Sequence, residues 1–255
     1  MALTKKAQEN LKKLFGGEPG PHPQDPELYE ILQNQIFDEV FSTGVIDEKK
    51  REMVTVVVLS SLQTLPQLKA HANAALNIGN QPIEIREAIY QIAPYIGYPR
   101  TLNAVSTVNE VFTERGIELP LPAAGTVKYE EREEKGAEIQ VPRYGNEVKE
   151  VFASLPGEFG KFVPHMLTAG GFGDYATRGV LSDADKELYA LIALVAIGAA
   201  TQIRPHIAGA VKAGNTLEEV TAAVVQAMPY TGFPYALSAL MQIAKYDGTN
   251  SEAYR

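Results

Sequence analysis

Apolar residues recur at helical spacing along nearly the whole chain, as expected for helices with one buried face. Near the N-terminus, Leu11 and Leu14 share a face with Ala7, and the pair Gly16-Gly17 marks the end of the segment. Up to residue 116 the pattern predicts helices over the ranges 4–15, 27–42, 47–62, 64–79, 82–92 and 101–115. Every regular element reads as helical, so the predicted fold class is all-α.

One segment is ambiguous between helix and strand. The valine-rich run 54–58 has the composition of a strand, but the matching segment L-Y-A-L-I-A-L-V-A-I further along the chain favours a helix. Asp47 and Ser182 are expected to cap the two helices that carry these segments. Because both segments are apolar on most faces, we expect both helices to be buried.

The stretch from residue 67 to 99 is written a second time from 202 to 234. Its first copy contains Q-L-K-A-H and P-Y-I-G-Y-P, and its second copy contains Q-I-R-P-H and P-Y-T-G-F-P. His71 and His206 are 135 residues apart (206 − 71), and Glu52 and Glu187 keep the same offset. The chain is therefore predicted to consist of two tandem repeats.

The repeats set the expected domain boundaries. Residues 1–116 form the first repeat, 117–135 form a linker that includes the start of a charged helix, and 136–255 form the second repeat. The charge run E-E-R-E-E-K at 130–135 is expected to be a solvated helix face. The polar tail after residue 246 is expected to fray.

Composition narrows the function classes. The formal net charge of −8 argues against nucleic acid or an anionic membrane as a partner. The chain has no cysteine, which excludes disulfides, thiolate metal sites and thiol nucleophiles. The N-terminal segment lacks the apolar core of a signal peptide and no apolar run is long enough to cross a bilayer, so a cytoplasmic protein is expected.

The repeated glutamate and histidine are the main candidates for chemistry. Glu52 and Glu187 lie in apolar helices, where a carboxylate must be paired. If neighbouring helices pack antiparallel, Glu52 reaches His71 and Glu187 reaches His206. Such a glutamate fixes the imidazole tautomer and leaves the other ring nitrogen free to act as a general base or acid.

Two other interpretations of these pairs stay open. Each Glu–His pair can instead have a purely structural role, in which it holds two helices together. Both pairs would then be present because the fold of each repeat needs them. Metal binding has weaker support, because each repeat offers one histidine and one glutamate without a third ligand at a recognisable spacing. No cofactor is predicted.

Three motifs occur in the same order in both copies: [RK]-E, A-x-x-x-[LVI]-x-x-G-N and P-Y-x-G-[YF]-P-x-x-L-x-A. On these motifs, over roughly 47–108 and 159–243, both copies resemble the carboxymuconolactone decarboxylase family, whose relatives include alkyl hydroperoxidase D. The resemblance implies an alkyl hydroperoxidase D-like helical fold in which the two repeats form a pseudo-dimer within one chain. It also implies a homotrimer with six repeat units.

In the hydroperoxidase branch, the resemblance implies a C-x-x-C pair ahead of the histidine. The corresponding positions here are Thr64 and Gln67 in the first copy, and Ala199 and Gln202 in the second. Without a thiolate the chain is not expected to be a thiol peroxidase.

The second copy also contains G-F-G-D-Y-A-T-R-G-V-L-S, similar to a segment of the true γ-carboxymuconolactone decarboxylases. The resemblance implies that Arg178 holds a substrate carboxylate, as a guanidinium is suited to do. A surface ion pair is the alternative for Arg178. The first copy has Thr43 at this position, so the two copies are not expected to share one substrate site.

Three further residues are candidates for substrate binding. His165 precedes Arg178 and is expected either to point into the same pocket or to be an ordinary, partly buried histidine. Tyr95 and Tyr230, in the P-Y-x-G bends, either line the mouth of a pocket or pack as aromatic residues at a turn.

Together these observations predict a cofactor-free carboxy-lyase that acts on a small carboxylated lactone or keto acid. His206 moves the proton, Glu187 orients His206, and His71 with Glu52 forms a second site. A hydroperoxidase-like antioxidant protein is one alternative, disfavoured by the missing cysteines. A non-catalytic binding or scaffold oligomer is the other.

Overall fold

The computed structural model describes residues 2–248, and every regular element among them is a helix. The first repeat contains α1 (Lys5–Phe15), α2 (Pro26–Asn34), the π-helix η1 (Gln35–Val40), the 3₁₀ turn η2 (Phe41–Thr43), α3 (Glu48–Leu62), α4 (Leu65–Asn77), α5 (Pro82–Gln91), α6 (Ala93–Ile96) and α7 (Tyr98–Glu114). A second set follows the linker: the 3₁₀ turn η3 (Tyr129–Glu131), α8 (Arg132–Tyr144), α9 (Glu147–Ala153), α10 (Phe159–His165), the π-helix η4 (Met166–Ala176), α11 (Asp183–Ala196), α12 (Ala200–Lys212), α13 (Leu217–Thr231) and α14 (Phe233–Ala244). The all-α prediction is confirmed.

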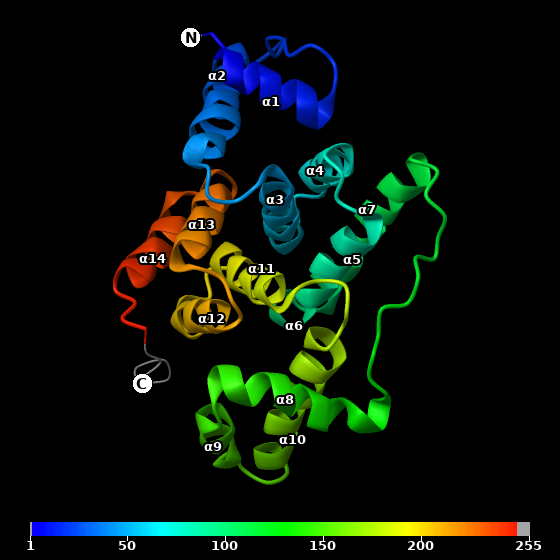
Figure 1. The fold of residues 1–255 in the computed structure, drawn as a ribbon, viewed down its shortest axis with the longest axis vertical. Coiled ribbons are helices and arrows are strands. Elements are labelled where there is room, and N and C mark those ends of the chain that lie inside the picture. The colour runs from blue at the N-terminus through cyan, green and yellow to red at the C-terminus, as the bar shows by residue number, and fades with distance from the viewer. Residues whose placement is uncertain (1, 249–255) are drawn as a thin grey trace.

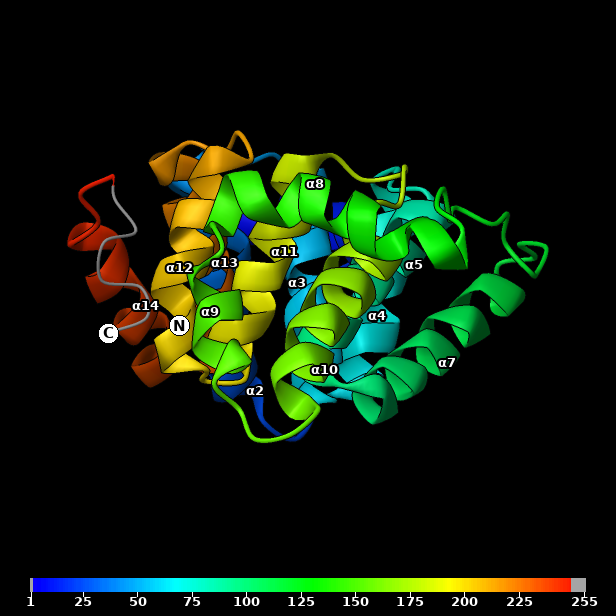
Figure 2. The ribbon, with the colours of Figure 1, turned by 90° about the horizontal axis from the view of Figure 1, so that it is seen from below.

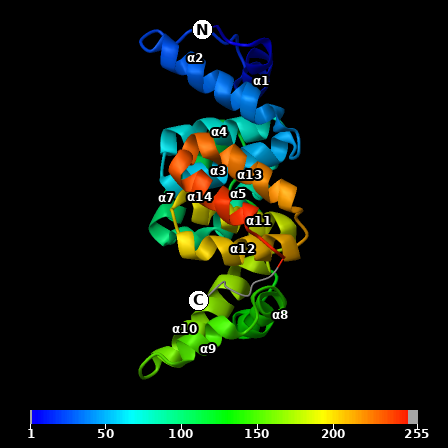
Figure 3. The same ribbon diagram turned by 90° about the vertical axis from the view of Figure 1, so that its left-hand side faces the viewer.

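The molecule is elongated, with a central helical block between two end caps (Figure 1, Figure 3). Helices α1 and α2 form one cap, and α8, α9 and α10 form the cap at the opposite end. The extended linker after α7 runs along one side of the molecule to the second cap (Figure 1), and the view from below shows it at the outer edge beside α7 (Figure 2). The two repeats are therefore related as two halves of a pseudo-dimer within one chain.

The core of the central block is shared between the repeats. Helices α3 and α11 pack against each other, and α13 of the second repeat also packs on α3. Val54, Val57, Leu191 and Val195 have no or almost no exposed surface in this core. Burying such side chains contributes about 1.5–3 kcal/mol each, so neither repeat is expected to be stable without the other.

Local sequence explains where the central helices begin. Asp47 accepts a hydrogen bond from the backbone N–H of Lys50, and Ser182 accepts one from that of Asp185, so both predicted N-caps are confirmed. The valine-rich run lies within α3 as a fully buried helix, because burial on all faces suits valine whatever its intrinsic propensity.

Several predicted elements differ in detail from those observed. The single helix predicted over 27–42 is split into three parts. The α-helix ends at Asn34, the wider π-helical turn of η1 follows, and the tighter 3₁₀ turn of η2 begins at Phe41. The predicted bend at 94–99 contains the one-turn helix α6 and turns at Gly97, where φ is 81°. Residues 249–255, which make up most of the tail expected to fray, lie outside the described residues.

Two glycines allow α8 and η4 to cross closely. A Cβ atom on Gly136 would overlap the backbone carbonyl of Thr168, and one on Gly173 would overlap that of Arg132. This crossing, in the N-terminal half of α8, packs α8 directly on η4, and both elements line the site described below. Among residues 2–248, no helix has both the length and the apolar character that crossing a membrane requires.

Candidate functional site

The second repeat holds a buried three-residue cluster formed by Glu187, His206 and Tyr144. Glu187 lies on α11 and His206 on α12, and their side chains are 3% and 9% exposed. The nearest carboxylate oxygen, Oε2, is 3.6 Å from Nδ1 of His206, too far for a good hydrogen bond. The hydroxyl of Tyr144, at the end of α8, links them: it donates to Oε2 of Glu187 and lies 2.9 Å from Nδ1 of His206.

These contacts determine the tautomer of His206. A tyrosine hydroxyl has one proton, and here that proton goes to the Glu187 carboxylate. The Tyr144 oxygen therefore accepts the Nδ1–H of His206, which leaves Nε2 as the reactive nitrogen. Glu187 thus reaches His206 as expected, at 3.6 Å, and Tyr144 adds the hydrogen bonds that link the two groups.

The charge of Glu187 is balanced by its surroundings. Nη1 of Arg143 donates to Oε1 at 3.0 Å, while Nη2 of Arg143 donates to Asp183. Burial alone would raise the pKa of Glu187, but His206, Tyr144 and Arg143 outweigh burial and lower this pKa below its ordinary value. Burial and the charge of Glu187 raise the pKa of Tyr144, so the hydroxyl keeps its proton.

A glycine on α12 makes room for this contact. A Cβ on Gly209 would overlap the hydroxyl end of Tyr144 and also crowd Oε2 of Glu187. Because α12 is otherwise regular, this glycine is explained by close packing and not by backbone conformation.

His206 opens onto a cavity of about 380 Å³. The cavity walls come from α6, α8, η4 and the α11–α12 region, and they include Tyr95, Gln140, Tyr144, Phe172, Gln202 and His206. Gln140 is buried, and its Oε1 accepts from Thr168. Nε2 of Gln140 has no hydrogen-bond partner among the described residues, so the amide can donate to a ligand in the cavity.

The first repeat builds the equivalent site more simply. Nδ1 of His71 lies 2.8 Å from Oε2 of Glu52, so the predicted contact between α3 and α4 is confirmed. Oε1 of Glu52 is buried without a hydrogen-bond partner among the described residues. His71 also borders a cavity, of about 320 Å³.

The two cavities differ in polarity at two matched positions. Phe15, at the end of α1, packs on His71 as Tyr144 packs on His206, with ring centroids 5.3 and 5.1 Å apart. One helical turn earlier, Leu11 lines the first cavity where Gln140 lines the second. At these two positions the His71 cavity lacks the hydroxyl and the amide of the His206 cavity, and its own amides come from Gln33 and Gln67.

Each histidine is covered by a tyrosine from the other repeat. Tyr95 packs edge-on against His206 with ring centroids 5.3 Å apart, and Tyr230 packs edge-on against His71 at 5.5 Å. Burial raises the pKa of both tyrosines, which therefore stay protonated. Tyr95 lines the His206 cavity, so that site is complete only with both repeats.

Arg178 does not lie where the sequence interpretation placed it. It lines a different cavity and pairs with Glu87 of the first repeat, with Nε 2.5 Å from Oε2 and Nη2 3.0 Å from Oε1. The reason is geometric. Phe172 of η4 lines the His206 cavity, whereas Gly173, Asp174, Tyr175 and Thr177 line the other cavity together with Arg178.

The symmetry-related position in the molecule has neither member of this ion pair. At the 135-residue offset, Arg178 corresponds to Thr43 and Glu87 corresponds to Ala222. A different arginine fills the space: Arg51 donates to Thr43 at 3.0 Å and to Gln226 at 3.1 Å. The change from arginine to threonine is therefore matched by a rearranged hydrogen-bond network.

His165 lies away from both histidine cavities. Its Nδ1 is 2.8 Å from Oε2 of Glu133, and both side chains are substantially exposed. The alternative of an ordinary, partly buried histidine describes this geometry, and His165 shares no cavity with Arg178. Within residues 2–248, no cluster of three or more His, Asp or Glu side chains is arranged to hold a metal ion.

The sequence interpretation missed three residues at the His206 site: Arg143, Tyr144 and Gln140. All three lie on α8, at the start of the predicted second repeat. The sequence does contain a sign that Tyr144 matches Phe15. Each is the last residue of its helix, α8 or α1, and each is followed by a glycine that caps the helix. Their offset is 129 (144 − 15), so a search at 135 does not align them.

Comparison with known proteins shows the same two segments. Residues 26–110 and 163–246 each match the carboxymuconolactone decarboxylase family. Over 91 residues, 36% of this chain and 68% of the relative, the chain is 33% identical to a 4-carboxymuconolactone decarboxylase of Acinetobacter baylyi. It is 30% identical over 86 residues to an uncharacterised protein of Methanocaldococcus jannaschii, covering 34% of this chain and 79% of that protein.

A further relative is the nitrosuccinic acid decarboxylase of Metarhizium robertsii, 27% identical over 86 residues, which are 32% of this chain and 60% of that enzyme. Both family segments exclude α1 and α8, so Phe15 and Tyr144 lie outside the matched regions. The matched segments contain both Glu–His pairs and together make up more than half of the sequence. The chain therefore belongs to the carboxymuconolactone decarboxylase family, with two copies of the family unit in tandem.

Proposed function

We propose that this protein is a carboxy-lyase that decarboxylates a small carboxylated lactone or keto acid in the His206 cavity. The observation that carries the proposal is the Glu187–Tyr144–His206 cluster beside a cavity of about 380 Å³. Two relatives bear the names of decarboxylases, 4-carboxymuconolactone decarboxylase and nitrosuccinic acid decarboxylase, which supports the reaction class.

In the proposed reaction the substrate carboxylate leaves as CO₂. The bond between the carboxylate carbon and the adjacent carbon breaks, and its electron pair moves into a conjugated carbonyl to give an enolate. The imidazolium of His206, protonated at Nε2, then delivers its proton to the carbon that lost CO₂. Tyr144 keeps its hydrogen bond to Nδ1, so the ring stays aligned through the transfer.

The positive charge needed at the substrate comes from His206 itself. A protonated imidazole faces the substrate carboxylate before the bond breaks and the enolate afterwards. The Gln140 amide supplies a further donor, and Tyr95 covers the histidine from the first repeat. In this scheme Gln140 replaces Arg178 as the group that orients the carboxylate.

The His71 site is proposed to be secondary. It retains the direct contact to Glu52, but Phe15 and Leu11 stand where the other site has Tyr144 and Gln140. The His71 ring therefore has no tyrosine linking it to its glutamate, and no amide stands at the place of Gln140. We therefore assign turnover to the second repeat.

A direct test is the release of CO₂ from γ-carboxymuconolactone by the purified protein. Catalysed release that saturates with substrate supports the proposal, and release no faster than in buffer contradicts it for this substrate. Measuring peroxide consumption in parallel addresses the antioxidant alternative, which the absence of cysteine disfavours.

We also propose a homotrimer, following the resemblance to family members with two repeats. Phe233, Leu237 and Met241 recur every four residues on α14, and all three side chains are exposed. An exposed apolar helix face of this kind is typical of an interface between subunits. Light scattering should give three times the chain mass of 27.7 kDa, and a mass of one chain would contradict the trimer.

A further inference from the structure

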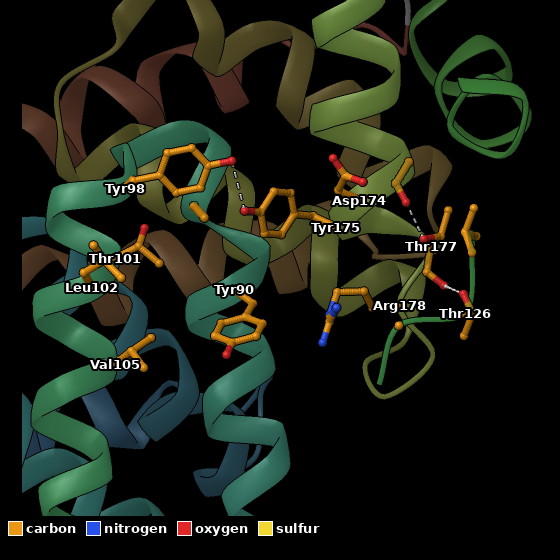
Figure 4. A pocket seen from close by; sticks show the side chains of 14 residues that line it. Tyr90, Tyr98, Thr101, Leu102, Val105, Thr126, Asp174, Tyr175, Thr177 and Arg178 are labelled. Atoms are coloured by element: carbon orange, nitrogen blue, oxygen red, sulfur yellow. Dashed lines mark hydrogen bonds between the residues drawn. The ribbon is translucent and has the colours of Figure 1, made fainter. Parts of the chain in front are cut away.

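A third cavity, of about 500 Å³, lies between the two repeats on the side of the linker. Figure 4 shows α5 and α7 on one side of it and the end of η4 with Arg178 on the other. This cavity and the His206 cavity lie on either side of the same two backbone segments. Ala93 and Gly173 line this cavity, and their chain neighbours Pro94 and Phe172 line the His206 cavity. None of its lining residues is shared with the His206 cavity.

One side of this cavity carries a net positive charge. Arg178 uses Nε and Nη2 to bind Glu87, and Nη1 has no hydrogen-bond partner among the described residues. Arg86 binds the same carboxylate, with Nη2 2.8 Å from Oε1. Two guanidinium groups therefore share one carboxylate, and one positive charge is left over beside the cavity.

Aromatic rings form the adjoining walls. The guanidinium carbon of Arg178 lies 5.2 Å from the centre of the Tyr90 ring, which holds the arginine against an aromatic face. Tyr175 donates its hydroxyl proton toward the Tyr98 oxygen at 3.4 Å, as the dashed line in Figure 4 marks. The proton of the Tyr98 hydroxyl is then available to a ligand.

The other polar groups in the cavity are already satisfied. The carboxylate of Asp174 pairs with Arg132 at 3.0 Å, so its charge is balanced. The hydroxyls of Thr101, Thr126 and Thr177 each donate to a backbone carbonyl. A ligand therefore meets a guanidinium nitrogen on one side and phenol hydroxyls on another, with aromatic and aliphatic surface between them.

We propose that this cavity binds a planar aromatic monocarboxylate. The carboxylate accepts from Nη1 of Arg178, and the ring lies among Tyr90, Tyr175 and the aliphatic side chains of α7. A volume of about 500 Å³ is within the usual range for small-ligand sites. The proposal is independent of the reaction assigned to His206, because binding alone tests it.

The first experiment is calorimetric titration of the unmodified protein with benzoate, with benzamide as an uncharged probe of the same shape. Saturable binding of benzoate, and binding of benzamide at least about tenfold weaker, is expected from the loss of a charge-assisted hydrogen bond. Absence of saturable benzoate binding, or equal affinity for both probes, would overturn the proposal.

A second experiment locates the site, using the fact that the chain has no tryptophan. Leu102→Trp places a fluorophore at this cavity, and Leu167→Trp places one at the His206 cavity. Benzoate should change the emission of the Leu102→Trp variant at lower concentration than that of Leu167→Trp. The reverse order, or a response only from Leu167→Trp, would assign the binding to the His206 cavity and overturn the proposal.

The residue assignment is tested in the Leu102→Trp background. Adding Arg178→Gln should weaken benzoate binding about tenfold or more, and unchanged affinity would contradict the role of Arg178. Because Arg178 also binds Glu87, this variant carries a risk of misfolding. Val105→Phe fills the cavity without touching the ion pair and should likewise weaken binding, whereas unchanged affinity would contradict the location.

Discussion

Tyr144 and Phe15 occupy equivalent places in the two repeats, each packed against the histidine of its repeat with ring centroids 5.1 and 5.3 Å apart. The difference between them is one hydroxyl group. In the second repeat that hydroxyl joins Glu187 to His206, and in the first repeat Glu52 contacts His71 directly. A duplicated scaffold thus carries two different hydrogen-bond arrangements.

Removing this hydroxyl tests whether Tyr144 positions His206. Tyr144→Phe leaves Oε2 of Glu187 and Nδ1 of His206 without their shared partner, so stability should fall by about 1–3 kcal/mol. If His206 transfers the proton, kcat should fall by about 10²-fold with KM little changed, because the ring loses its alignment.

The measurement is steady-state kinetics over a range of pH, beside urea unfolding of the same variant. A purely structural tyrosine would lower stability while leaving kcat and its pH profile unchanged in the folded protein, and that result would contradict the positioning role. Phe15→Leu is the matched control at the first repeat, and it should leave kcat unchanged.

Gly209 gives a second prediction, about packing. Its counterpart at the 135-residue offset is Ala74, in the repeat where Phe15 takes the place of Tyr144. Gly209→Ala should displace the Tyr144 hydroxyl and cost about 1–3 kcal/mol by overpacking, even though alanine is the better helix former.

The double variant Gly209→Ala with Tyr144→Phe recreates the combination found in the first repeat. Its loss of stability should be smaller than the sum of the two single losses by at least about 0.5 kcal/mol, because both changes act on one contact. Denaturant unfolding of the four proteins measures this coupling, and strict additivity would show that the two residues are independent.

The stability of the fold should depend on pH through Glu187. Its pKa is lowered in the folded state, although burial opposes this, while a glutamate in an unfolded chain titrates near about 4.3. As the pH falls below that value, the unfolded chain takes up the proton first. The contribution of Glu187 is therefore fully present above about pH 4.3 and is lost as the pH falls through the folded pKa.

Urea unfolding between pH 7 and pH 3 measures this contribution. Glu187→Gln should show a shallower loss of stability in the acid range than the unmodified protein, while Glu130→Gln, at an exposed position, serves as the matched control. Equal slopes for Glu187→Gln and the unmodified protein would show that Glu187 does not carry the pH dependence.

Much of this architecture could be predicted from the sequence because its causes are local. Helical spacing of apolar residues, the caps at Asp47 and Ser182 and the fixed offset of the repeats indicated the elements, the fold class and both Glu–His pairs. The contact between Glu52 and His71 followed from two consecutive helices packing antiparallel, which needs no knowledge of the rest of the fold.

The parts that could not be predicted depend on the lengths of loops and on contacts between repeats. The second repeat has the extra helix α9 after Tyr144. Residues before α9 are therefore offset by 129 from their counterparts in the first repeat, and the later motifs by 135, which conceals the match between Tyr144 and Phe15. The pairing of Tyr95 with His206 crosses between repeats, so proximity in sequence gives no sign of it.

The position of Arg178 could not be predicted for a third reason. It follows a π-helical turn, whose wider winding changes which residues face each wall, and a pattern based on ordinary helical spacing cannot anticipate the change. Its partner, Glu87, is 91 residues away in the other repeat. An arginine at this position indicated carboxylate binding, but only the fold shows that the carboxylate it binds is that of Glu87.

The most direct test of the account compares His206→Gln with His71→Gln in one assay of CO₂ release from γ-carboxymuconolactone. The two histidines are equally buried, each 7% exposed, so the substitutions are closely matched. The account predicts that His206→Gln lowers kcat by about 10²-fold or more while His71→Gln retains most activity. Equal turnover by both variants, or a larger loss in His71→Gln, would contradict the assignment of catalysis to the second repeat.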